Sequence, residues 1–147
     1  MRENRMGIGL LIIRLVVGLL FIGHGSQKLF GLFGGYGLQG TGGFFESIGL
    51  TPGTLMAFVA GAGELVGGIL LVLGLVTPIA SAMISVIMLG AIVKLHAPAG
   101  LWADQGGMEY PLVLIATVIG IAFIGSGKYS LDHHFFKKNA EGVISND

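Results

Sequence analysis

Long apolar segments separated by short polar connections dominate this chain. Three of them run over about residues 7–29, 53–76 and 79–95, and a fourth runs over about residues 109–124. An α-helix rises 1.5 Å per residue, so about 20 residues cross the roughly 30 Å apolar core of a bilayer. The pattern therefore predicts an all-α integral membrane protein, with residues 1–147 forming one four-helix bundle.

The connections between these segments indicate an orientation. Residues 30–52 are rich in glycine and phenylalanine and contain one acid, Glu46, and no lysine or arginine, which is typical of a segment at the membrane interface. The positive-inside rule places basic connections in the cytoplasm. We therefore expect both termini to be cytoplasmic and the protein to reside in the cell membrane, because the basic residues outside the spans all lie in the terminal segments: Arg2, Arg5, Lys128, Lys137 and Lys138.

Composition narrows the chemistry. Only 11% of the residues are charged and 53% are hydrophobic, whereas a soluble domain carries about 25% charged residues. The 27 glycines suit helices packed closely in lipid. A net charge of zero gives no general attraction to nucleic acid. There are no cysteines, which excludes thiol redox relays and iron–sulfur clusters on this chain, and no nucleotide or haem site is evident.

Ionisable residues inside the apolar segments are the candidates for function, because burying a charge in hydrocarbon is costly. Arg14 lies about 12 Å into the first span from its cytoplasmic end at 1.5 Å per residue. Counting along the second span places Glu64 at a comparable depth. The sequence thus predicts a buried Arg14–Glu64 ion pair at mid-depth, in which each charge makes the other tolerable.

A second polar group is predicted near the outer end of the bundle. His24, Gln27 and Lys28 share one face of the first span, although Lys28 could instead reach the interface by snorkelling. His96 approaches the same height from the third span, and Glu109 stands in the first turn of the fourth, where the helix dipole alone also favours it. Whether Lys94 or His96 faces the site is open, because a regular helix places them about 200° apart.

This predicted chamber suits a small polar head group attached to an apolar ring. Amines and imidazoles can donate hydrogen bonds to oxygen atoms, and histidine can exchange protons near neutral pH. A quinone, hydroquinone or catechol meets both demands. Two histidines and a carboxylate could instead hold a transition metal, but the nearby lysines oppose a cation. His133 and His134 are adjacent and point different ways, so no metal site is expected there either.

Three blocks of sequence resemble the DoxX family. They are RLVVGLLFIGHGSQKLFG in the first span, GAGELVGGILLVLGLVTPIA across the second, and GSGKYSLDHHF after the fourth. The resemblance implies a small four-helix membrane protein of a family described as oxidoreductases, which includes the membrane subunit of archaeal thiosulfate:quinone oxidoreductase. In its short length, the chain resembles the bacilli branch of the family, which is linked to catechol and quinone tolerance, more than it resembles the thiosulfate branch. The family pattern falls on these positions: Arg14, His24, Gln27, Lys28, Glu64 and the SLD at 130–132.

Together these observations predict a membrane oxidoreductase, or a quinone-handling subunit of one, acting in detoxification or respiratory redox chemistry. His24, Lys28 and His96 would contact the ligand, and a bound quinone or a partner subunit would supply the redox group. The alternative is a non-enzymatic membrane module, either a transporter or a scaffold that anchors a soluble oxidoreductase. Candidate partners are the lipid bilayer, a quinone-type small molecule, a soluble oxidoreductase and a second copy of the chain.

Overall fold

The structure, a computed structural model, describes residues 2–135 and contains α-helices without strands in that range. α1, α3 and α4 (with the turns that continue it) are long and apolar enough to cross a membrane, and α5 is a shorter apolar helix. The predicted all-α four-helix membrane bundle is therefore confirmed, while the orientation of its termini stays a prediction. The helices are α1 (Arg2–Phe30), α2 (Gly37–Ser47), α3 (Gly53–Leu73), α4 (Thr77–Ala91) and α5 (Glu109–Ile124).

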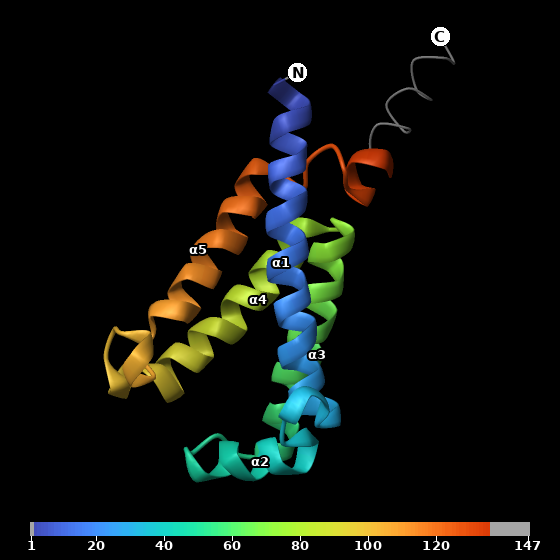
Figure 1. The fold of residues 1–147 in the computed structure, drawn as a ribbon. Helices are drawn as coiled ribbons and strands as arrows, with labels where there is room; N and C mark the ends of the chain where they lie inside the picture. The colour runs from blue at the N-terminus through green and yellow to red at the C-terminus, as the bar shows by residue number, and fades with distance from the viewer. Residues whose placement is uncertain (1, 136–147) are drawn as a thin grey trace.

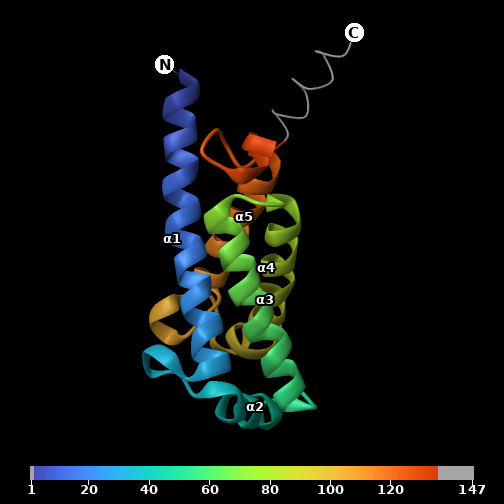
Figure 2. The same ribbon diagram turned by 90° about the vertical axis from the view of Figure 1, so that its right-hand side faces the viewer.

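Helix α3 occupies the centre of the bundle. It packs mainly against α1 and also against α4, which in turn packs against α5. Figures 1 and 2 show α2 lying across the ends of α1 and α3, at the opposite end of the molecule from the N-terminus. The buried core is formed by residues of α1, α3, α4 and α5: Val17, Phe21, Leu71, Ala80, Ile84, Met88, Leu114 and Val118.

Glycines set the register between α1 and α3. A Cβ atom on Gly25 would lie 2.6 Å from the carbonyl oxygen of Gly61, and one on Gly18 would lie 2.8 Å from that of Gly68. Real side chains do not approach backbone atoms so closely, so these glycines let the two helices touch backbone to backbone. Gly25 therefore stands opposite Gly61, and Gly18 opposite Gly68.

This register leaves the first turns of α1 projecting beyond the end of α3 (Figure 2). Arg14 lies beside Gly74, the residue that ends α3 in a left-handed conformation (φ 65°), and a Cβ there would meet the guanidinium group at 2.6 Å. Glycine is thus required at position 74 both by its backbone angle and by the neighbouring arginine.

Helix α4 changes form near its end. Residues Ile92–His96 form a π-helical turn, and Ala97–Ala99 follow as a 3₁₀ turn. Proline disfavours regular helix in the residue before it, and Pro98 stands here. The π-helix is rare in proteins and is often found at functional sites. The wider turn changes which way the side chains of Lys94 and His96 point.

Candidate functional site: a charged pair between two spanning helices

A lysine and a glutamate from adjacent spanning helices form the site. Nζ of Lys28 in α1 donates a hydrogen bond to Oε2 of Glu64 in α3 over 2.7 Å. The Glu64 side chain is only 3% exposed, whereas that of Lys28 is 24% exposed. Lys28 therefore reaches the surface of the bundle and also neutralises a buried carboxylate, which snorkelling to the interface alone would not do.

Two further predicted residues lie on the same stretch of α1. His24 lies one turn before Lys28 on α1 and is half-buried. The side-chain amide of Gln27 instead donates to the carbonyl oxygen of Phe33 over 3.2 Å. Gln27 thus holds the chain as it leaves α1, and His24, Lys28 and Glu64 form the polar cluster.

The predicted Arg14–Glu64 pair is wrong. Among the described residues, the Glu64 carboxylate pairs with Lys28 alone, and Arg14 lies beside Gly74, about 15 Å from Glu64 along α3 at 1.5 Å per residue. Counting residues from the ends of the apolar segments gave Arg14 and Glu64 the same depth. This was wrong because Gly18 and Gly25, where α1 touches α3, shift α1 along α3. Arg14 is buried as expected, with 1% of its surface exposed, but it lies level with the end of α3.

Arg14 binds backbone carbonyl groups. Its Nε donates to Leu71 over 3.1 Å, and one terminal nitrogen donates to Val72 over 3.3 Å and to Tyr129 over 2.8 Å. The other terminal nitrogen donates to the carbonyl oxygen of Ser126. The last four carbonyls of a helix have no intrahelical partner and carry partial negative charge. Arg14 therefore caps the C-terminus of α3 and ties the segment after α5 to it.

The SLD sequence completes this junction. Asp132 accepts hydrogen bonds from the backbone N–H groups of Val76 and Thr77, at 2.8 and 3.2 Å, and from the Thr77 hydroxyl at 3.1 Å. The hydroxyl of Ser130 accepts one from the N–H of His133 and so begins the short helix at 131–135. Asp132 thus caps the N-terminus of α4 from a distant part of the chain. The motif is structural in this respect.

Replacing Asp132 with alanine should lower the free energy of unfolding by about 1–2 kcal/mol, the typical cost of losing an N-cap carboxylate. Thermal unfolding in detergent measures this loss. The matched control is Asp104→Ala, because Asp104 is an exposed acid with no capping role in the structure. Equal melting temperatures for the two variants would contradict the capping role.

His96 and Glu109 do not join the polar cluster, so the predicted single outer chamber is wrong. Nδ1 of His96 lies 2.8 Å from the carbonyl oxygen of Gly106, and Glu109 accepts a hydrogen bond from the N–H of Ala103 over 2.9 Å. Both side chains therefore fold the connection between α4 and α5. Figure 1 shows this connection at the lower left, apart from the lower end of α1. Lys94 is exposed.

Sequence reasoning missed the backbone ligands of Arg14 and the true partner of Glu64. The signal for Arg14 was Gly74, since a glycine after an apolar run marks a helix end whose carbonyls need donors. The signal for the pair was the row of small residues around both Lys28 and Glu64. Among residues 2–135, no three histidine, aspartate or glutamate side chains gather closely enough to hold a metal ion.

Comparison with known proteins places the chain in a family. The DoxX family model matches residues 9–97. The chain is 38% identical over 140 residues to the Bacillus subtilis protein named Putative oxidoreductase CatD, covering 94% of this chain and 95% of that protein. It is 37% identical over 136 residues to an uncharacterized membrane protein of Mycobacterium tuberculosis, covering 86% and 80% of the two chains. No solved structure matches it. The chain therefore belongs to the DoxX family of membrane proteins.

Proposed function

We propose that this protein is a membrane oxidoreductase, or a subunit of one, that binds quinone- or catechol-type compounds at the Lys28–Glu64 pair. The observation that carries the proposal is a carboxylate with 3% exposure placed between two spanning helices. Such a charge is costly in a membrane and is a functional candidate by default. The name of the Bacillus subtilis relative supports the oxidoreductase class.

The chemistry of the pair suits a phenolic or quinoid head group. An ammonium group has three N–H donors, and Lys28 gives one of them to Glu64. Its remaining donors can bind a quinone oxygen or a phenolate. Only Oε2 of Glu64 has a donor among the described residues, so Oε1 is available to accept a hydroxyl proton from a hydroquinone or catechol. His24, one turn before Lys28, adds an imidazole that can form a further hydrogen bond to the head group.

The protein's own part is thus to bind the head group and exchange its protons. Electrons would pass between the bound compound and a redox partner, because the chain has no cysteine to carry them. The apolar surfaces of α1 and α3 would hold the ring and any chain attached to it.

Binding of a short-chain quinone analogue tests the site. Lys28→Met and His24→Ala should each weaken binding about tenfold to a hundredfold, because each removes a charge-assisted hydrogen bond contributing about 1.5–3 kcal/mol. Calorimetric titration of monodisperse protein measures the affinity. Lys94→Met is the matched control, since it removes an exposed lysine of the π-helical turn that follows α4, and this variant should bind as the unmodified protein does.

Unchanged affinity in both variants would contradict the quinone site. Lys28→Met strands the Glu64 charge, so Lys28→Met/Glu64→Leu, which removes both charges, shows whether lost binding reflects lost folding. Oxidation of a quinol with an added electron acceptor would support an enzyme. Binding without turnover, together with a co-purifying soluble oxidoreductase, would support the scaffold function.

A further inference from the structure

A cavity of about 470 Å³ lies at the end of the bundle where α1 begins and α5 ends. It is far from Lys28 and Glu64, because Lys28 is in the last turn of α1 and the cavity is formed around its first turns. Two of the glycines that line it lie close together: a Cβ on Gly127 would lie 3.7 Å from the Cα of Gly7, and one on Gly7 would lie 3.2 Å from the Cβ of Lys128. The volume is in the range of ligand sites.

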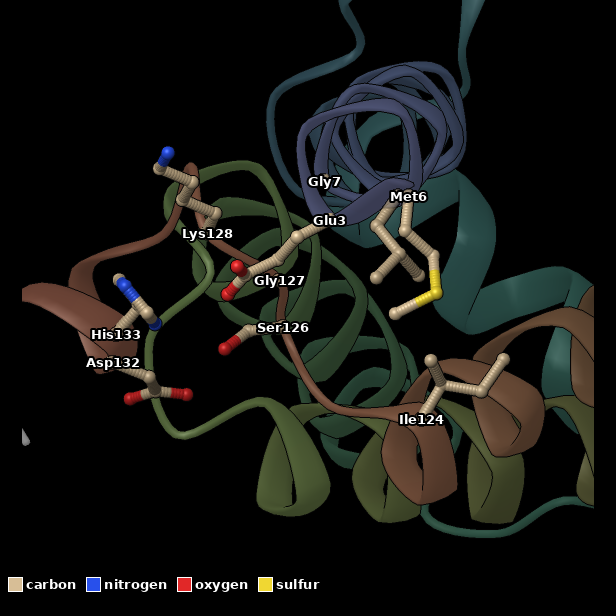
Figure 3. A pocket seen from close by; sticks show the side chains of 10 residues that line it. Glu3, Met6, Gly7, Ile124, Ser126, Gly127, Lys128, Asp132 and His133 are labelled. Atoms are coloured by element: carbon tan, nitrogen blue, oxygen red, sulfur yellow. The ribbon is translucent and has the colours of Figure 1, made fainter. Parts of the chain in front are cut away.

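The cavity has an apolar half and a polar half. Figure 3 shows Met6 and Ile124 on one side, and Glu3, Asp132 and His133 on the other. Met6 and Ile124 are 59% and 64% exposed, so the apolar half continues onto the outer surface of α1 and α5. Met6 begins the apolar part of α1, and Ile124 ends α5. The cavity therefore lies where the surface that faces hydrocarbon gives way to polar residues.

The polar half contains one acid, Glu3, and one base, Lys128, that are available to bind a ligand. Asp132 is already engaged at the N-terminus of α4. Glu3 is exposed in the first turn of α1, and Lys128 donates to the side-chain oxygen of Asn4 over 2.8 Å. Neither Glu3 nor Lys128 forms an ion pair with another described residue. Lys128 keeps two of its three N–H donors for a ligand.

We propose that this cavity binds the head group of a zwitterionic lipid that carries a primary ammonium and a phosphate. The ammonium lies at Glu3 and the phosphate at Lys128, and an acyl chain leaves along Met6 and Ile124. A purely anionic head group would be repelled by Glu3. A quinone carries no charge and would leave both groups without partners. A quaternary choline has no N–H to donate to the Glu3 carboxylate.

Native mass spectrometry of the full chain in detergent, titrated with phosphatidylethanolamine, phosphatidylcholine and phosphatidylglycerol, tests the proposal. Phosphatidylethanolamine should bind about tenfold more tightly than the other two, the difference made by one charge-assisted hydrogen bond. Glu3→Gln should abolish this preference. Glu3→Lys should reverse it in favour of phosphatidylglycerol. Asp104→Asn is the matched control, because it removes an exposed carboxylate outside the cavity and should retain the preference.

Three results would overturn the proposal. One is equal binding of the three lipids to the unmodified protein, and another is a preference that survives both Glu3 variants. The third is tight binding of glycerophosphoethanolamine, which has the head group without acyl chains, because the apolar half would then contribute nothing and the ligand would be a water-soluble phosphate compound. Glu3 is exposed at the helix start, so these variants should fold, and their melting temperatures confirm this.

Discussion

Replacing Arg14 with methionine should lower the free energy of unfolding by about 3–5 kcal/mol. The substitution removes every hydrogen bond that the guanidinium group gives to α3 and to the segment after α5. Leaving a buried acceptor without a donor costs about 1–3 kcal/mol, and several acceptors lose their donor together. Thermal unfolding in detergent, or reversible unfolding in mixed micelles, measures the loss.

Two further variants separate the hydrogen bonds of Arg14 from its charge. Arg14→Lys keeps the charge but places all its donors on one atom, so it should recover only part of the stability. Arg5→Met removes an exposed arginine of the same helix and should unfold as the unmodified protein does. If Arg14→Met and Arg5→Met were equally stable, this result would contradict the capping role of Arg14.

Arg14 and Glu64 should also behave as independent sites. Their side chains share no partner in the structure, and substitutions at distant sites usually add within about 0.5 kcal/mol. The loss in an Arg14→Met/Glu64→Gln double variant should therefore equal the sum of the two single losses.

Among glycine-to-alanine substitutions in α1, Gly25→Ala should lower the free energy of unfolding the most. The new Cβ would lie 2.6 Å from backbone atoms of Gly61 and Leu65, and backbone atoms cannot move aside as a flexible side chain can. The two helices must separate, so we expect a loss of about 2–3 kcal/mol or more, at the upper end of the usual cost of overpacking. The melting temperature in detergent should fall accordingly.

Gly23→Ala provides the matched control, two residues earlier in the same helix. A Cβ at Gly23 meets nothing within 4 Å, and alanine is favoured over glycine in a helix by about 1 kcal/mol. This variant should be as stable as the unmodified protein or slightly more stable. If both alanine variants melt at the same temperature, the close contact of α1 with α3 does not control stability.

The number and class of the helices could be predicted because hydropathy alone decides them. An apolar run long enough to span a bilayer has few alternatives to a helix in lipid. The relative depth of charges on different helices could not be predicted in the same way. It depends on how far one helix is shifted along its neighbour, and here Gly18 and Gly25 set that shift. The same shift brings Lys28 to Glu64 and carries Arg14 away from it.

The predicted position of His96 was wrong for a different reason. A regular helical continuation of α4 could not fix its direction, and the π-helical turn changed the angle between successive side chains. His96 then met the carbonyl oxygen of Gly106. Long-range backbone partners such as this one and those of Arg14 leave no periodic signal in a sequence, because carbonyl groups are present at every residue.

The ligands of Arg14 also bear on how the protein is made. Leu71 and Val72 follow Arg14 into the membrane early in synthesis, but Ser126 and Tyr129 emerge from the ribosome only when α5 is complete. During translation the guanidinium group in the first helix is thus only half satisfied. Its final ligands arrive with almost the last part of the described chain. A nascent chain that stops short of residue 126 would therefore leave the guanidinium group without the carbonyl oxygens of Ser126 and Tyr129.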